Sequence, residues 1–437
     1  MKKLLVVSYS GFSDTNANGK TLKALLNDFE PENIMQFYRG TQEPDFSSCS
    51  RCFRVTDKQI IKSFLRRKDT KYFENTLDDE ENKGAATVNN TVKPKQKKVQ
   101  SFLKKHNYNY ALRGLREYLF MLSPWGEKEL MDKIEEFSPD GLLYMVGDNF
   151  SLDKLVLKIV KKYNIPLILF NTEAFRIIDL HTRHGLEKLY CKHTEDTYEE
   201  LDRQSVLTIY ICDMLKEHYM QLYKGCRKHI VAYNSDVFDT PQYTNSGKAE
   251  KIAYFGNLGV GRTDPLIEMA GALEKIDENL YIDVYGSTSE ENKNKLRNVP
   301  NIHFHGFVSQ NVLGKVKEEA DILLHTESFN SEIVPKLKYA FSTKIAQYLC
   351  SGRCVVSYAP EETASSQYLI NTKSAVVVTR AERLEESLRE VVFDGEKRMQ
   401  YARQAYMTAK ENHDMNKTAK MISEAINTVC KLKKGKL

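Results

Sequence analysis

The sequence predicts an α/β protein built from two doubly wound parallel-sheet domains, each Rossmann-like in its alternation of strands and helices. Continuous apolar runs of four to seven residues recur along the chain, separated by longer segments with helical spacing. A stretch rich in Pro, Gly, Asn, Ser and Thr, residues 238–250, divides these runs into two groups. The length of 437 residues also exceeds one ordinary core and fits two or three folding units.

The apolar runs identify the expected strands in chain order. Before the linker they are KLLVVS, DGLLYMV, IPLILF and HIVAY; after it they are KIAYFG, LYIDVYG, NIHFHG, DILLH, RCVVSY and SAVVV. Because such runs lack polar alternation, we expect strands that are buried on both faces. We place the first domain at residues 1–237 and the second at 250–395. The charged segment 396–437 is expected to form helices long enough to pack back on the first domain.

Composition limits the classes of protein that fit. The net charge of +5 is mild, so composition does not call for a nucleic-acid partner. We find no run of 18 apolar residues, and Met1-Lys2-Lys3 leads directly into a strand-like run rather than a signal sequence. We therefore expect a cytoplasmic protein in which the 8 scattered cysteines are reduced thiols.

Two short motifs raise the question of a metal site. Cys49 and Cys52 form a C-x-x-C pair, but no second pair of ligands follows at a suitable spacing. His181 and His184 lack a third ligand nearby. We expect ordinary thiols and histidines, with no metal and no cofactor.

The first strand leads into YSGFSDTNANGKT, residues 9–21, whose ending resembles a phosphate-binding P-loop. That loop needs a glycine five positions before Gly19, and Asp14 stands there instead. A carboxylate at this point would repel an anion, so the P-loop interpretation fails. We expect a strand, a loop and a helix, with Gly11 and Gly19 bordering a cleft.

A basic segment follows a polar stretch at about 66–100, which we predict to be a mobile loop because it is poor in apolar residues. An apolar stripe then recurs at helical spacing up to Leu122, with almost no acid among the cations around it. One interpretation is a core-packing helix with a solvated basic edge. The other is docking on an anionic membrane surface through Lys93 to Leu122. The stripe is Tyr108, Leu112, Leu115, Leu119 and Leu122, and the cations are Lys93, Lys95, Lys97, Lys98, Lys104, Lys105, Arg113 and Arg116.

The second half contains the most informative pattern, KIAYFGNLGVGRTDPLIEMAGAL, residues 251–273. A strand ends at Phe255, a glycine-rich loop follows, and a helix begins near Asp264 with Pro265 in its first turn. Glycines let the backbone approach a ligand closely, while Arg262 and the helix N-terminus supply positive potential. An anion fits such a loop.

Further loops are expected at the same edge of the sheet. Gly286, Gly306 and Thr326 come just after strands, and ligands of open parallel sheets bind outside the carboxyl ends of strands. Lys344 is a second cation near a helix start. We expect these groups to border one crevice.

This order of motifs resembles the donor-binding domain of GT-B glycosyltransferases, especially bacterial enzymes of capsule, lipopolysaccharide and exopolysaccharide assembly. The matching stretches are FGNLGVGR, LIEMAGAL, YIDVYGS, NIHFHGFVS, ADILLHTES and TKIAQYLCSGRCVVS. The resemblance implies two domains facing a central cleft and a nucleotide-diphosphate sugar as donor. It implies that the leaving diphosphate is held by Gly256, Gly261 and Arg262, that the base lies by His305 to Val308, and that Lys344 and Gln347 hold ribose and phosphates.

One departure from that family concerns its Glu-x7-Glu pattern, because Tyr339 and Gln347 stand at the matching places. The expected activity is transfer of a hexose to a glycan or lipid-linked acceptor at the inner face of the membrane. We find no clear Asp-x-Asp dyad in a strand-end loop, which agrees with catalysis without a metal.

Asp148 and Glu173 follow first-domain strands and are candidate catalytic bases or helix caps. Two alternatives stay open: a sugar-nucleotide epimerase and a non-catalytic GT-B-fold partner protein.

Overall fold

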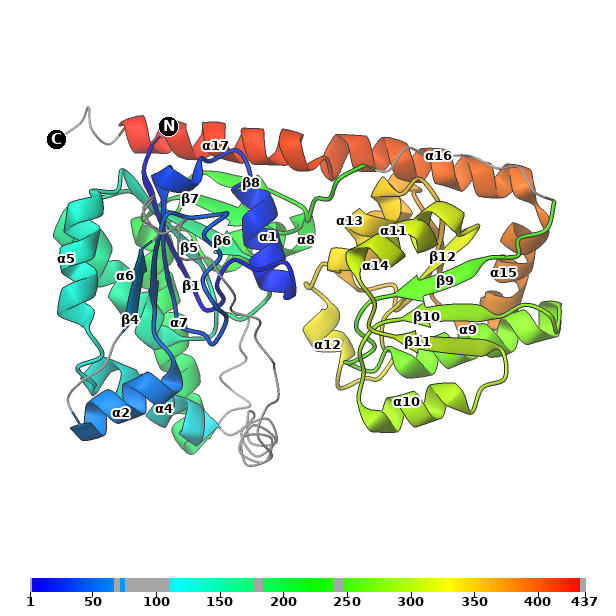
Figure 1. The fold of residues 1–437 in the computed structure, drawn as a ribbon, viewed down its shortest axis with the longest axis horizontal. Coiled ribbons are helices and arrows are strands. Elements are labelled where there is room, and N and C mark those ends of the chain that lie inside the picture. The colour runs from blue at the N-terminus through cyan, green and yellow to red at the C-terminus, as the bar shows by residue number, and fades with distance from the viewer. Residues whose placement is uncertain (1, 67–70, 75–109, 177–183, 239–246, 433–437) are drawn as a thin grey trace, which may run out of the picture. The chain divides into compact units, whose positions relative to one another are not determined.

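The computed structural model describes residues 2–66, 71–74, 110–176, 184–238 and 247–432 (Figure 1). The chain forms two compact units. Unit 1 comprises Met1–Tyr210, His218–Ile230 and Lys420–Leu437, and unit 2 comprises Ile211–Glu217 and Val231–Ala419. The end of the chain, which we expected to pack on the first domain, is thus counted with unit 1 from Lys420 onward.

Unit 1 contains an eight-stranded sheet in the order β4-β3-β2-β1-β5-β6-β7-β8. The ladders from β3 to β7 are parallel, and β4 runs antiparallel to β3. The strands are β1 (Leu4–Ser8), β2 (Ile34–Tyr38), β3 (Arg51–Arg54), β4 (Lys71–Glu74), β5 (Gly141–Met145), β6 (Leu167–Asn171), β7 (Ser205–Tyr210) and β8 (His229–Val231).

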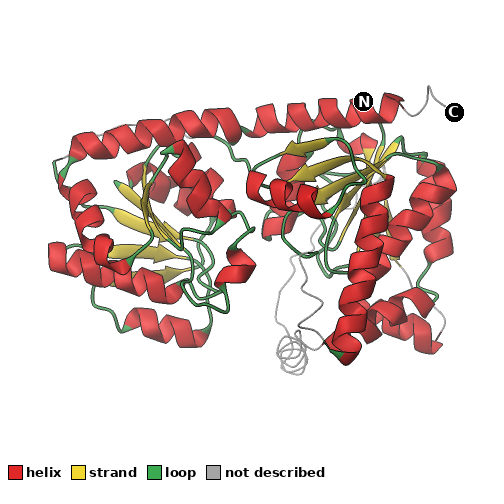
Figure 2. Cartoon of the chain, turned by 180° about the vertical axis from the view of Figure 1, so that it is seen from behind, coloured by secondary structure: helices red, strands yellow, loops and turns green. Residues whose placement is uncertain are grey.

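Unit 2 contains a six-stranded parallel sheet in the order β11-β10-β9-β12-β13-β14. Its strands are β9 (Ile252–Phe255), β10 (Ile282–Tyr285), β11 (Ile302–Gly306), β12 (Ile322–Thr326), β13 (Cys354–Tyr358) and β14 (Val376–Val378). The strands of each sheet lie between helices (Figure 2). The predicted class, two α/β domains with parallel sheets, is confirmed.

Helices connect most of these strands. In the first part of the chain they are α1 (Ala17–Leu25), α2 (Asp57–Arg66), α4 (Tyr110–Leu122), α5 (Glu127–Phe137), α6 (Phe150–Tyr163), α7 (Gly185–Gln204) and α8 (Asp213–Leu222). After β9 they are α9 (Thr263–Ile276), α10 (Glu290–Arg297), α11 (Gln310–Glu319), α12 (Val334–Leu337), α13 (Thr343–Cys350), α14 (Ala364–Thr372), α15 (Leu384–Phe393), α16 (Gly395–Asn412) and α17 (Met415–Leu432). None of the helices in the described ranges is long and apolar enough to cross a bilayer.

All ten strands expected from apolar runs are present, but the sequence reading missed β2, β3, β4 and β7. In β2 the run is interrupted by Gln36, which is buried and accepts a hydrogen bond from the Phe12 N–H at 3.2 Å. A satisfied polar side chain can occupy a buried strand at little cost. β4 lies inside the segment predicted as a mobile loop, and residues 75–100 of that segment lie outside the described part.

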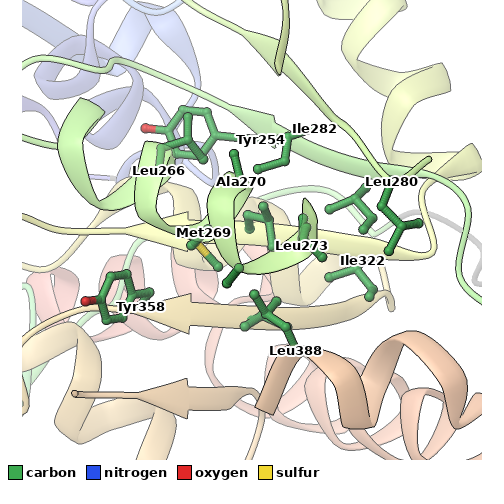
Figure 3. Close-up of a cluster of buried hydrophobic side chains, with 14 of the residues drawn as sticks. Tyr254, Leu266, Met269, Ala270, Leu273, Leu280, Ile282, Ile322, Tyr358 and Leu388 are labelled. Atoms are coloured by element: carbon green, nitrogen blue, oxygen red, sulfur yellow. The ribbon is translucent and has the colours of Figure 1, made fainter. Parts of the chain in front are cut away.

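The core of unit 2 explains how its sheet and first helix hold the ligand loops. α9 buries Leu266, Met269 and Leu273 against side chains of β9, β10, β12 and β13 (Figure 3). α15 adds Leu388 to the same cluster. On the other face of the sheet, the Tyr348 ring of α13 packs at 4.4 Å on Phe255. The end of β9 is therefore fixed from both faces.

The cysteines lie inside the two units. All 8 are buried, and none forms a disulfide. Among the described residues, no group of three or more His, Cys, Asp and Glu side chains could hold a metal ion. His181 lies outside the described residues, while His184 precedes α7 on the surface.

Candidate functional site

The predicted glycine loop joins β9 to α9 in unit 2. Gly256 has φ of +134° and Gly261 has φ of +72°, conformations that L side chains rarely adopt. A Cβ on Gly256 would also lie 2.6 Å from Lys344 Cδ. The absence of a side chain at this position therefore lets the lysine stem pass against the loop.

Arg262 ends this loop at the N-cap of α9. Its Nε donates to Glu327 Oε2 at 2.8 Å and its Nη2 donates to Glu327 Oε1 at 3.2 Å, a two-point pair. Its Nη1 also donates to the Gly259 carbonyl at 3.3 Å. Thr326 supports the same turn, because its hydroxyl donates to the Arg262 carbonyl at 3.2 Å.

Lys344 lies in the first turn of α13 and is buried. Its Nζ donates to the Tyr254 hydroxyl at 3.0 Å, and among the described residues no carboxylate lies within ion-pair distance of it. Tyr254 belongs to the core cluster beneath α9, so the lysine is held by a rigid partner (Figure 3). A buried ammonium whose hydrogen-bond partner is a neutral phenol is costly in the absence of an anion.

Burial and proximity determine the electrostatics of this cluster. Its members are Arg262, His325, Glu327 and Lys344. Burial, and then the charge of Arg262, lower the pKa of Lys344 to about 7. Despite its burial, Glu327 has a pKa lowered to about 2 by its close contact with His325 and by the charges of Arg262 and Lys344. Burial lowers the pKa of His325, which is therefore neutral near pH 7. With Lys344 protonated, the cluster carries two positive charges and one negative charge.

The other donor-side residues lie at ends of neighbouring strands. The Gly256 N–H donates to the Tyr285 carbonyl at 2.9 Å, and the Gly286 N–H donates to the Gly306 carbonyl at 2.8 Å. These bonds connect the loops after β9, β10 and β11. His305 lies at the end of β11, where its Nε2 is 2.6 Å from Asp283 Oδ1 and its ring stacks on Tyr285.

Three further predicted positions complete the description of this edge. Val308 is half-buried just after β11, and Gln347 is half-buried on α13, one turn after Lys344. Tyr339 lies between α12 and α13, so it is not on the helix that carries Gln347. The two positions of the Glu-x7-Glu pattern therefore belong to different local structures.

In unit 1 the first loop has no phosphate-binding geometry. The Gly19 N–H donates to the side chain of Asn16, the N-cap of α1, at 2.7 Å. Asp14 pairs with Lys23 at 2.8 Å. Gly11 lies against the Tyr38 ring, which leaves no room for a side chain. The loop therefore leads into α1 and is stabilised by the Asn16 cap. This agrees with the conclusion from the sequence that it is not a P-loop.

The two candidate bases of unit 1 lie close enough to interact. Asp148 pairs with Arg113 at 2.5 Å. Desolvation by neighbouring groups, and then the charge of Asp148, raise the pKa of Glu173, although its side chain is partly open to solvent. A carboxyl group with a raised pKa is a better proton acceptor than an ordinary one. Since Asp148 is already paired with a cation, Glu173 is the stronger of the two candidates.

The sequence reading missed Glu327 and His325, although both belong to HTES at the end of β12. His325 Nε2 lies 3.5 Å from Glu327 Oε1, and its Nδ1 lies 2.9 Å from the Ser357 hydroxyl. The available signal was an acid and a histidine next to a continuous apolar run. Of these four residues, only Thr326 was predicted to belong to the site.

Two α/β units with parallel sheets, one of them with a glycine loop and buried cations at its strand ends, agree with the expected GT-B fold. Residues 262–424 match the family model described as glycosyl transferase-like. The chain therefore has the GT-B fold with a glycosyl transferase-like C-terminal part, and the resemblance predicted from its motifs is confirmed. A comparison with curated protein sequences finds no significant match.

Solved structures agree with this fold along nearly the whole chain. Anabaena HepE, solved in complex with UDP, has 11% identity and a TM-score of 0.62, with 98% of this chain and 100% of that chain covered. Sucrose-phosphate synthase from Thermosynechococcus elongatus has 10% identity and a TM-score of 0.60, covering 98% and 99%. The lipopolysaccharide outer core galactosyltransferase WaaB has 14% identity and a TM-score of 0.54, covering 97% and 99%.

Proposed function

We propose that this protein transfers a hexose from a nucleotide-diphosphate sugar to a glycan or lipid-linked acceptor in bacterial surface polysaccharide synthesis. The observation that carries the proposal is the buried Lys344 ammonium, which has no carboxylate partner in the described structure and lies next to Arg262. Such a group is stabilised when an anion binds. HepE, a structural relative, was solved with UDP and with UDP-glucose, which supports a nucleoside diphosphate as that anion.

The chemistry requires stabilising negative charge on the departing diphosphate while the sugar develops positive charge. Arg262, Lys344 and the N-terminus of α9 supply positive potential at the loop after β9. One preorganised donor of this kind is typically worth about 2.7–4 kcal/mol in the transition state. Two cations can thus support departure of the diphosphate without a metal or another cofactor.

We assign the residues that contact the nucleotide base and the ribose from their positions at the strand ends of unit 2. His305, Gly306 and Val308 would border the base, and the Gln347 amide would hydrogen-bond the ribose. On the acceptor side, which we assign to unit 1, Glu173 is the candidate catalytic base, Asp148 lies beside it, and Gly11 and Gly19 belong to the first loop. We place the enzyme in the cytoplasm.

A non-catalytic binding protein is the second candidate, and Gln347 favours it. An amide can hold ribose, but it cannot replace the charge of the family carboxylate. Both candidates predict nucleotide binding. Only the enzyme releases nucleoside diphosphate from the donor when an acceptor is supplied.

A thermal-shift screen tests the nucleotide proposal directly. UDP, GDP, CDP and ADP are compared with the matching monophosphates and nucleosides. We expect one diphosphate at 100 times its Kd to stabilise the full chain by about 2.7 kcal/mol, because it binds only the folded state. The matching nucleoside should give no comparable shift, since it lacks the charges that the two cations attract. Failure of every diphosphate and every sugar nucleotide to raise Tm would contradict the proposal.

We further propose that unit 1 docks on an anionic lipid surface. Within α4 most of the apolar stripe is exposed: Leu115 is 55% and Leu122 is 71% exposed, while Leu119 is half-buried and Tyr108 lies outside the described residues. α4 contacts both α2 and α7 (Figure 1). We call the exposed apolar residues of these three helices the apolar face: Ile61, Phe64, Leu65, Leu112, Leu115, Met121, Leu122, Leu186 and Leu189.

Charge favours a lipid surface as the occupant of the apolar face. Lys58, Lys62, Lys188 and Lys192 are exposed on α2 and α7, and each cation near anionic lipid contributes roughly 1 kcal/mol. The expected cations at 93, 95, 97, 98, 104 and 105 lie outside the described residues. Apolar insertion flanked by cations is the pattern of interfacial docking.

Vesicle binding tests this surface. Leu115→Glu combined with Leu122→Glu should lower partition to vesicles containing phosphatidylserine at least tenfold, because both changes oppose insertion and charge attraction. The matched control is Met407→Glu, an exposed apolar residue of α16 in unit 2, which should leave partition unchanged. Equal partition of the unaltered protein to neutral and anionic vesicles would remove the proposal.

A further inference from the structure

The cation that we assign to the diphosphate is already paired with a carboxylate of its own chain. The side chains of Arg262 and Glu327 are 17% and 4% exposed, so the pair is largely shielded from water. A lone arginine would attract a diphosphate more strongly than a paired one. The role proposed above for Arg262 therefore does not explain why Glu327 is present.

Glu327 fixes the direction of the guanidinium. A guanidinium has five N–H bonds in a planar fork. Glu327 accepts from Nε and Nη2, and the Gly259 carbonyl accepts from Nη1. These three contacts determine the plane and rotation of the group, which leaves the two remaining N–H bonds of Nη1 and Nη2 in a defined direction.

Glu327 also sets the charge of the cluster. The groups that face it are Arg262 at the start of α9, Lys344 on α13 and His325 on β12. Tyr254 and Tyr348 lie close enough to interact with it, but burial raises the pKa of both hydroxyls, which stay neutral. With Lys344 protonated, the cluster would carry two positive charges without Glu327, and it carries a net charge of one with Glu327.

We propose that Glu327 is a positioning residue that orients Arg262 and lowers the affinity of the site for free nucleoside diphosphate. The inference rests on the proposed glycosyl transfer. A nucleoside diphosphate gains a terminal phosphate ionisation when the sugar leaves, so it is more negative than its sugar ester near pH 7.5. Repulsion by Glu327 therefore acts more strongly on the product than on the donor. It favours release of the product after transfer.

The test is calorimetry on the full chain at pH 7.5 with UDP and with inorganic pyrophosphate as probes. Glu327→Gln keeps the length of the side chain and an acceptor oxygen for Arg262 while removing the charge. We expect it to bind both probes about 5- to 20-fold more tightly, because one opposing charge near the anion is lost. The gain should shrink as salt is raised from 50 to 500 mM.

Two further variants make the result specific. Glu332→Gln removes an exposed carboxylate five residues later and should change the affinities less than twofold. Glu327→Asp keeps the charge, so its affinity for UDP should stay within twofold of the unaltered protein. A solely structural role for Glu327 would weaken binding in both Glu327 variants.

The outcomes separate the inference from the proposed function. If the unaltered protein binds UDP but Glu327→Gln binds it equally or less tightly, the inference is wrong and the proposed function stands. If neither protein binds pyrophosphate or any of UDP, GDP, CDP and ADP, both are overturned. Should Glu327→Gln fail to fold, an affinity of Glu327→Asp more than threefold from that of the unaltered protein would overturn the inference.

Discussion

Replacing Arg262 with alanine will lower the rate of sugar transfer by about 10²- to 10³-fold, because a preorganised donor to the departing diphosphate is lost. The change also leaves Glu327 buried without its two-point partner. Breaking a buried pair in this way typically costs about 3–5 kcal/mol of unfolding free energy. The measurements are release of nucleoside diphosphate from the sugar nucleotide that the thermal-shift screen identifies, calorimetry with that diphosphate, and denaturant unfolding.

The double variant Arg262→Ala with Glu327→Gln separates the two effects. It removes the unpaired carboxylate, so most of the unfolding free energy should return. The transfer rate should stay low because the guanidinium is still missing. Unaltered affinity of Arg262→Ala for UDP would contradict the role that we assign to Arg262.

Replacing Lys344 with methionine should stabilise the free protein near pH 7 and weaken its binding of nucleoside diphosphate at least tenfold. Methionine keeps an unbranched apolar stem beside Gly256 but removes a buried ammonium whose hydrogen-bond partner is a phenol. The cost of burying that charge disappears, together with its attraction for an anion. A loss of both stability and binding would indicate that Lys344 serves mainly in packing.

The pH dependence of stability distinguishes this charge effect from packing. Lys344 has a pKa of about 7 in the folded chain against 10.5 for the ordinary side chain. Between these values the unfolded chain binds more protons, so the free energy of unfolding rises with pH. From pH 7 to pH 9 the unaltered protein should gain on the order of 2 kcal/mol relative to Lys344→Met. Lys315→Met, an exposed lysine on α11, should show no such difference.

The elements that the sequence predicted share one property, a continuous apolar run. β5, β6, β9 and β13 are examples whose residues are all buried. β2 and β7 were missed because Gln36 and Thr208 interrupt their runs and Ser205 begins β7. Each of these side chains is hydrogen-bonded in the folded chain, which a search for apolar runs cannot anticipate.

The candidate site, too, could be predicted from local sequence patterns only in part. Arg262 and Lys344 could be identified because each cation stands beside a helix start that follows a strand or loop pattern. The pairing of Arg262 with Glu327 could not, because 65 positions separate the two residues and only the parallel order of β9 and β12 brings them together. Likewise, the depressed pKa of Lys344 depends on burial against Tyr254, which its local sequence does not reveal.

A crystal structure of the full chain with UDP tests the central claim most directly. The account predicts that oxygens of the diphosphate lie within hydrogen-bond distance of both the Arg262 guanidinium and the Lys344 ammonium, next to the loop that contains Gly256 and Gly261. A diphosphate bound elsewhere, with Lys344 still donating only to Tyr254, would contradict it.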